Sequence, residues 1–163
     1  MRKTFFCFCV IFLSLNPAIA GWQNTEWNMS IEEFQMLSTD FKYTTKNNNT
    51  GSVEITYPYF VDDIEMEASL FFEGLPNSEI LSRVNLSIAD PKDCLSVLGL
   101  LRATYGAPES EESTSDGLMS IWQWRDTNNE NLLNYLAVGV QLSPVSCLVI
   151  YQPLPISNNS GGL

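Results

Sequence analysis

Three carboxylates at alternate positions come closest to the spacing of a chemical site. Asp63, Glu65 and Glu67 alternate with apolar residues in a predicted strand, so we expect them on one strand face. Such a group could ligate Ca²⁺ or supply the two acidic groups of a glycosidase. The same alternation is typical of an ordinary half-exposed strand, and we favour that interpretation.

Histidine chemistry is absent from this chain. Its 163 residues include no His, which excludes Ser-His-Asp and Cys-His catalytic arrangements and every His-ligated metal site. The segment 126–131 begins like a calcium loop, but Ala137 stands where the bidentate Glu should be, so we interpret it as a hairpin turn. We therefore expect no enzymatic activity, no cofactor and no metal.

Aromatic and acidic residues in the second half supply a possible partner-binding surface. Trp122 and Trp124 share a predicted strand face, and aromatic pairs can stack on sugars or anchor a partner, although core packing under a helix is the simpler interpretation. Glu109, Glu111 and Glu112 belong to the acidic, serine-rich segment 109–117, which lacks periodicity and predicts a mobile loop.

Residues 1–20 predict a secretory signal peptide. Arg2 and Lys3 precede an apolar run over 5–15, and small residues at 18–20 form an A-x-A pattern that predicts cleavage before Gly21. The run is too short for a transmembrane helix. We expect a periplasmic or secreted protein that is not inserted in a membrane after cleavage.

Removal of the signal makes the chain more acidic. Six basic residues would remain against 19 acidic ones, a net charge of −13. Such a charge argues against nucleic acids and anionic membranes as partners. It would attract a cationic protein partner, or it would only keep an exported protein soluble.

Two cysteines, Cys94 and Cys147, remain after cleavage. An oxidising compartment favours a disulfide between them. A redox or nucleophilic role would need a C-x-x-C spacing or a His neighbour to lower the thiol pKa, and the chain has neither. We expect a structural disulfide.

The order of predicted elements indicates an α+β fold. We expect an antiparallel β-sheet meander with two helices packed on one face and one disulfide, in a single domain over 21–152 with a disordered tail over 153–163. A capping box at Ser30 and Glu33 predicts a helix over 31–38 with an apolar stripe of Ile31, Phe34 and Leu37.

The second predicted helix covers 91–105, between the N-cap Asp90 and the stop residue Gly106. Its predicted core stripe comprises Leu95, Leu98, Leu101, Arg102 and Tyr105. The predicted strands cover 40–46, 52–57, 63–72, 80–88, 118–125, 132–142 and 145–152. Pro58 is expected to interrupt the second strand, and Arg83 to lie across from a carboxylate.

The chain resembles a set of small uncharacterised bacterial exported proteins that begin W-G-M-[ST] after a signal. The matching residues are Trp22, Trp27, Met29, Ser30 and Glu32, then Cys94, Leu98, Leu101, Tyr105, Gly106 and Pro108, then Trp122, Trp124 and Cys147. Asn28 stands where those proteins have Gly. The resemblance implies a periplasmic location, a disulfide and an α+β fold, and it implies no activity.

Three function classes follow from the sequence. The first is a binding or inhibitory module with an acidic surface for a cationic protein, such as a lysozyme-like enzyme or an exported toxin. The second is a structural protein that maintains the cell envelope. The third, which the sequence favours least, is a carboxylate-based hydrolase.

Overall fold

The computed structural model describes residues 21–37, 42–48, 52–140 and 143–155. The predicted signal peptide lies outside these residues, as does the predicted tail beyond residue 155. None of the described helices is long and apolar enough to cross a membrane. The elements are α1 (Ile31–Leu37), β1 (Thr44–Asn48), β2 (Ser52–Val61), β3 (Ile64–Glu73), β4 (Ile80–Ile88), the 3₁₀ helix η1 (Pro91–Asp93), α2 (Cys94–Tyr105), β5 (Ser110–Ser113), β6 (Met119–Asp126), β7 (Asn131–Val140) and β8 (Ser143–Pro153).

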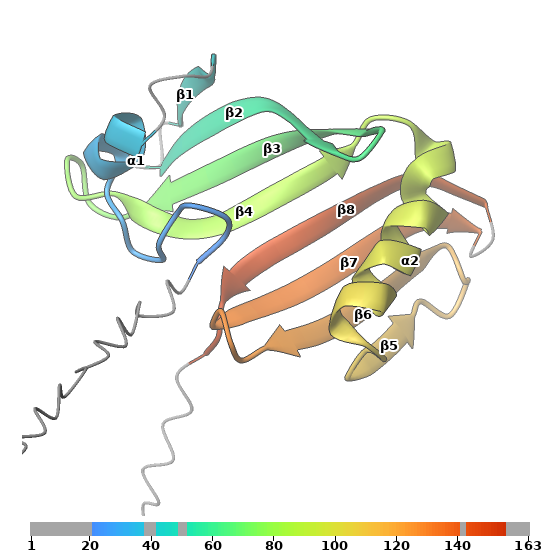
Figure 1. The fold of residues 1–163 in the computed structure, drawn as a ribbon. Coiled ribbons are helices and arrows are strands. Elements are labelled where there is room, and N and C mark those ends of the chain that lie inside the picture. The colour runs from blue at the N-terminus through green and yellow to red at the C-terminus, as the bar shows by residue number, and fades with distance from the viewer. Residues whose placement is uncertain (1–20, 38–41, 49–51, 141–142, 156–163) are drawn as a thin grey trace, which may run out of the picture.

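The eight strands form one antiparallel sheet in the order β1-β2-β3-β4-β8-β7-β6-β5 (Figure 1). The first four strands follow one another as a meander, and the last four form a second meander that runs back toward the first. The two meanders meet where β4 pairs with β8. The predicted α+β class with an antiparallel sheet is therefore confirmed.

The two meanders repeat one structural plan. A helix followed by four strands occurs twice, as α1 with β1 to β4 and as α2 with β5 to β8. Each half also has a register shift between its third and fourth strands, at Phe71/Phe72 in the first and Val138/Gly139 in the second. The sheet thus has an approximate twofold relation about the β4–β8 pairing, which the sequence did not reveal.

The core lies on one face of the sheet. On β3, the predicted alternation is confirmed, because Met66, Ala68, Leu70 and Phe72 are buried whereas Glu65 and Glu67 are exposed. Residues at successive register positions share a face, so this covered face continues through β4 and β8 to β7 and β6. Its buried members on the last three strands are Cys147, Val149, Tyr151, Asn131, Leu133, Tyr135, Ala137, Ser120, Trp122, Trp124 and Asp126.

Helix α1 begins at the predicted capping box. The Ser30 backbone N–H donates to Glu33 Oε2 at 2.7 Å, and the Glu33 N–H donates to Ser30 Oγ at 3.2 Å. Phe34 is 2 % exposed, but Leu37, expected in the same buried stripe, is 58 % exposed. Because the helix has only seven residues, its buried face consists mainly of this one aromatic ring.

The predicted second helix consists of the 3₁₀ turn η1 followed by the 12 residues of α2. Asp90 accepts a hydrogen bond from the Lys92 N–H at 3.1 Å, and Gly106, with φ 80°, ends the helix as predicted. Leu95, expected in the core, is 44 % exposed, because the buried stripe begins one residue earlier. That stripe is Cys94, Val97, Leu98 and Leu101, which recur at three and four residues.

Three predictions about the strands are wrong. Pro58 does not interrupt β2, because β1 pairs with β2 only as far as Thr56 and Pro is tolerated along an unpaired edge. The acidic segment predicted as a loop contains β5, which pairs with β6 along its full length. Residues 143–144, predicted as a turn, belong to β8.

The predicted disulfide joins the start of α2 to β8. Cys94 and Cys147 are bonded with Cα atoms 5.8 Å apart, and both are buried. The Tyr135 hydroxyl donates a hydrogen bond of 2.7 Å to the Cys94 carbonyl oxygen. The first turn of α2 is thus attached to the sheet by one covalent bond and one hydrogen bond.

Removal of this disulfide should lower stability substantially. It spans a sequence separation of 53 residues, for which the loop-entropy relation gives about 4 kcal/mol. In urea unfolding, we expect the free energy of unfolding of the double variant Cys94→Ala/Cys147→Ala to be about 2–4 kcal/mol lower than that of the oxidised wild type. The reduced wild-type chain should unfold at the same urea concentration as the double variant. Coincident unfolding of the oxidised wild type and the double variant would contradict this expectation.

Asn28 has a left-handed backbone conformation with φ 69°. Its N–H donates to the Leu81 carbonyl at 3.1 Å, and the Leu81 N–H donates to the Met29 carbonyl at 2.9 Å. This turn therefore joins the N-terminal segment to β4. Asn adopts left-handed conformations more readily than other non-glycine residues.

Substitution at Asn28 tests this backbone requirement. We expect Asn28→Gly to preserve stability and Asn28→Ala to lose about 1 kcal/mol, because a Cβ without a local hydrogen-bonding group disfavours positive φ. Thermal unfolding of the two variants provides the comparison. A lower midpoint for the Gly variant than for the Ala variant would refute it.

Candidate functional site

The candidate site is the outer face of the sheet, defined as the side that bears Glu67, Asn85 and Leu136, opposite the covered face. On β6 to β8 this face is mainly apolar, with one polar pair among the apolar residues, Gln123 and Asn134, whose side chains are hydrogen-bonded at 2.9 Å. Ile121 lies opposite Leu136, which lies opposite Leu148. We call this area the apolar strip; its members are Met119, Ile121, Leu132, Leu136, Leu148 and Ile150, all half-buried, and Val138, which is 38 % exposed.

Adjacent apolar residues within the predicted strands indicate the apolar strip. Leu132-Leu133 and Val149-Ile150 are adjacent apolar pairs within predicted strands. Neighbouring residues of a strand point to opposite faces, so such pairs indicate that both faces are apolar. The covered face receives Leu133 and Val149, and the outer face receives Leu132 and Ile150.

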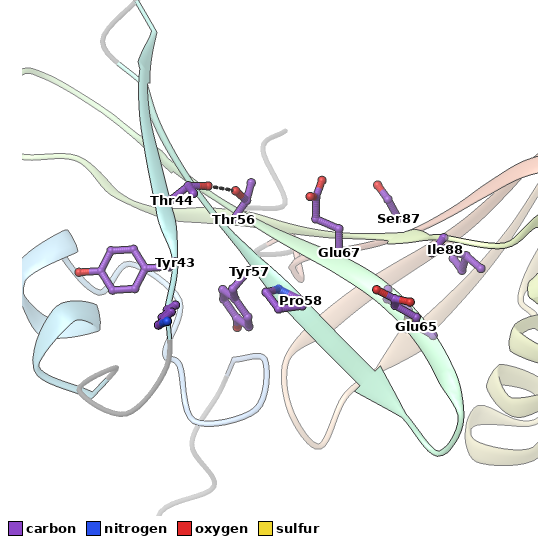
Figure 2. Close-up of a pocket in the computed structure, with 12 residues that line it drawn as sticks. Tyr43, Thr44, Thr56, Tyr57, Pro58, Glu65, Glu67, Ser87 and Ile88 are labelled. Carbon is purple, nitrogen blue, oxygen red and sulfur yellow. Dashed lines mark hydrogen bonds between the residues drawn. The ribbon is translucent and has the colours of Figure 1, made fainter.

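The first half of the sheet is hollowed, and both polar and apolar groups line the hollow. A groove of about 510 Å³ crosses β1 to β4. Figure 2 shows Thr44, Thr56, Glu67 and Ser87 pointing to the same side of the sheet, with a hydrogen bond between the two threonine hydroxyls. Glu65 also lines the groove, and both glutamates are exposed. Solvated carboxylates therefore border a groove of mixed polar and apolar lining beside the apolar strip.

Arg83 lies on the outer face of β4. Its guanidinium carbon is 4.2 Å from the centre of the Phe71 ring, and its register partner is Phe71. The expectation that it faces a carboxylate is wrong, because the register that begins at Met66 and Ile88 places an aromatic residue opposite it. Arg83 Nε and Asn85 Oδ1 are buried and have no hydrogen-bond partner within the described part of the chain.

The predicted aromatic pair lies in the core. Trp122 and Trp124 are 2 % and 1 % exposed. The Trp122 ring centre is 5.5 Å from that of Tyr135, and Trp124 Nε1 donates to the Gly106 carbonyl at 3.0 Å. In this conformation a partner cannot reach either ring, so both tryptophans serve packing on the covered face.

The three predicted acidic residues do not form one cluster. Glu109 Oε2 lies 3.3 Å from Arg125 Nε, and Glu111 Oε2 lies 3.7 Å from Arg102 of α2. Glu112 is exposed on the outer face, opposite Ile121. Only Glu112 therefore adjoins the apolar strip directly.

The carboxylate row is shorter than predicted. Glu65 and Glu67 share the outer face of β3, but Asp63 belongs to the turn before that strand. The segment 126–131 forms the predicted hairpin turn between β6 and β7, in which Asp126 accepts hydrogen bonds from the backbone N–H groups of Asn128 and Asn129. Within the described ranges, no three acidic or cysteine side chains gather closely enough to hold a metal ion.

No protein-family model, curated protein or solved structure matches this chain. The chemistry of the outer face is therefore the basis for a functional proposal. That chemistry is an apolar centre on β6 to β8, a groove of mixed lining on β1 to β4, and exposed carboxylates at Glu65, Glu67 and Glu112.

Burial raises the pKa of tyrosines around the site and the core. The pKa of Tyr57, which lines the groove, is raised by burial and by the neighbouring Tyr59. Burial raises the pKa of Tyr135 to about 12. It also raises the pKa of Tyr105 and Tyr151.

These shifts predict alkaline instability. An unfolded tyrosine ionises near its ordinary pKa of about 10, whereas the folded chain keeps these hydroxyls neutral at higher pH. The stability that Tyr135 contributes is present below about pH 10 and is lost as pH rises toward about 12. Titration of tyrosinate absorbance should show Tyr135 ionising late in the wild type, with that component missing from Tyr135→Phe. Ionisation of all tyrosines near pH 10 in the folded chain would contradict this expectation.

Proposed function

We propose that this chain is an exported binding module that uses the outer face of its sheet to bind a cationic protein. The observation that carries the proposal is the apolar strip on β6 to β8, which lies on the same face as the exposed carboxylates Glu65, Glu67 and Glu112. Protein interfaces combine an apolar centre with a polar rim, as this face does.

We also infer that both helices cover the same face. The Phe34 ring centre of α1 is 5.9 Å from that of Phe72, and α2 is bonded to Cys147 and to the Tyr135 hydroxyl. The register supports one shared face for Phe72, Tyr135 and Cys147. With both helices there, the outer face would be free for a partner.

The net charge supports a basic partner. After signal cleavage the chain would carry a charge of −13, which would steer a cationic protein toward it and repel an anionic one. The disulfide agrees with a periplasmic or secreted location, where bridges persist. The binding energy would come mainly from the apolar strip, and the charges would set encounter rate and selectivity.

The proposal assigns no catalytic step to the carboxylates. A glycosidase acid needs a pKa raised by a desolvated pocket, and Glu65 and Glu67 are exposed beside an open groove. Their position suits electrostatic attraction of a basic surface better than proton transfer.

Titration against lysozyme, a basic secreted protein, tests the proposal. Calorimetry at about 0.01 M and about 0.15 M salt changes the Debye length from about 30 Å to about 8 Å. We expect a complex whose affinity falls at least tenfold between these conditions, and basic proteins of a periplasmic extract provide a second panel. Absence of a salt-sensitive complex with lysozyme and with every protein of that panel would refute the proposal.

Two double variants test whether the carboxylates of the outer face attract the partner. Glu65→Gln/Glu67→Gln should weaken the complex several-fold at low salt, whereas the control Glu26→Gln/Glu32→Gln, with the same change in net charge elsewhere, should have a smaller effect. Equal losses in the two double variants would show that net charge, and not this face, attracts the partner.

Leu136→Thr tests the apolar strip, since it removes a half-buried apolar side chain from the centre of the face. We expect a loss of about tenfold in affinity at both salt concentrations. The control Leu75→Thr changes an exposed leucine in the turn between β3 and β4 and should leave affinity unchanged. Unchanged affinity in Leu136→Thr would exclude the strip from the interface.

A further inference from the structure

A second hollow lies at the N-terminal segment, away from the outer face. Its volume is about 380 Å³, and it is bounded mainly by polar groups. Its walls are Gly21, Trp22, Gln23, Tyr59, Tyr105, Asp126, Asn129, Asn131 and Tyr151. We infer that this hollow is the binding site for the α-ammonium group that signal cleavage would create at Gly21.

Gly21 is already fixed at the hollow by hydrogen bonds. Its N–H donates to the Asn129 carbonyl at 3.3 Å, and its carbonyl accepts from Asn131 Nδ2 at 2.9 Å. Asn131 Oδ1 accepts a further hydrogen bond of 2.9 Å from Trp27 Nε1. The first residue of the predicted mature chain is therefore held in one position by the turn between β6 and β7.

Position 21 also requires glycine. A Cβ atom placed there would lie 1.9 Å from the backbone oxygen of Thr25, a distance that no real contact allows. Thr25 cannot move aside easily, because its N–H and its hydroxyl both bond to the Trp22 carbonyl, at 3.0 Å and 2.6 Å. The close turn at 21–25 thus places the nitrogen of residue 21 at the hollow and leaves no room for a side chain at that position.

The hollow supplies the charge and acceptors that an ammonium needs. Asp126 is 8 % exposed, and its Oδ2 accepts a hydrogen bond of 2.6 Å from Asn129 Nδ2. The other titratable groups that line the hollow are the hydroxyls of Tyr59, Tyr105 and Tyr151, and none of its lining residues is basic. A buried carboxylate is stabilised by a paired cation, and no side chain at this hollow provides one.

Cleavage changes what residue 21 can donate. The amide nitrogen of an uncleaved chain has one hydrogen, which it gives to Asn129, whereas an ammonium group has three hydrogens and a positive charge. The additional hydrogens would enter a hollow whose walls include possible acceptors, the Asp126 carboxylate and the tyrosine hydroxyls. Cleavage therefore supplies the cation that the side chains of the hollow lack, and it attaches the N-terminal segment more firmly to the second half.

The pairing has a defined pH dependence. An α-amino group has an ordinary pKa of about 7.7–8.0, and a nearby carboxylate raises the pKa in the folded chain. The contribution to stability is therefore complete below about pH 7.7 and is lost as pH rises through the higher folded pKa. The pKa values of Tyr59, Tyr105 and Tyr151 are raised above the ordinary 10, so these groups stay neutral in that window.

The experiment compares a chain that begins at Gly21 with one that begins one residue earlier, at Ala20. In the second chain residue 21 has an amide nitrogen, and the charge is displaced from Asp126. We expect the chain that begins at Gly21 to melt about 5 °C higher at pH 7, with the difference declining as the α-amino group loses its proton. Equal melting temperatures at pH 7 would overturn the inference, and so would N-terminal sequencing of the exported protein that gave a first residue other than Gly21.

A double-mutant cycle combines the extra N-terminal residue with Asp126→Asn. It separates pairing of Asp126 with the ammonium group from the hydrogen bonds that Asp126 accepts in its own turn. We expect the extra N-terminal residue to lower the melting temperature of the wild type but not that of Asp126→Asn. Asp116→Asn is the matched control, because Asp116 also accepts a backbone N–H in a turn, from Leu118 at 3.0 Å. If the extra residue lowers all three melting temperatures equally, Asp126 does not bind the ammonium group.

Gly21→Ala provides an independent test of the close turn. We expect it to abolish the difference between the two chain starts, whereas Gly99→Ala, where an added Cβ meets nothing within 4 Å, should preserve it. A full difference in Gly21→Ala would contradict the inference. These measurements report stability and do not depend on a partner, so their outcome is independent of the proposed binding function.

Discussion

The pairing of β4 with β8 is the interaction on which the rest of the structure depends. It consists of four register pairs, from Val84 with Tyr151 to Ser87 with Leu148, and it joins two meanders that otherwise pair only within themselves. The N-terminal segment reinforces this junction, because it bonds to β4 through Asn28 and to the β6–β7 turn through Gly21. The disulfide does not cross the junction, since both of its cysteines belong to the second half.

Continuity of the sheet across this junction creates two extended faces with different chemistry. The covered face holds the buried aromatic residues and the disulfide. The outer face combines an apolar area on one half with exposed carboxylates beside a groove on the other. Neither half alone would present both areas, so the proposed binding surface depends on the register in which β4 and β8 meet.

Much of the fold was predictable because local patterns determine it. The alternation on β3, the Asp90 and Gly106 ends of α2, and the Cys94–Cys147 bridge follow from strand periodicity, capping chemistry and an even cysteine count. Predictions failed where tertiary pairing decides the structure. The strand β5 has no apolar alternation and forms because β6 offers an edge, and the partner of Arg83 depends on the register between β3 and β4, which no local pattern determines. The candidate surface was not predicted, because the two tryptophans of β6 were chosen as possible partner-binding residues although they fill the core.

The two outermost strands have a consequence for self-association. β5 and β1 have four and five residues, with the polar sequences SEES and TTKNN. Short, charged edge strands discourage the addition of further strands, which is the usual route from a sheet to a fibril. The acidic residues of β5 therefore have a protective role whether or not they contact a partner. A long antiparallel sheet with an apolar strip is in this way protected from growing edge to edge.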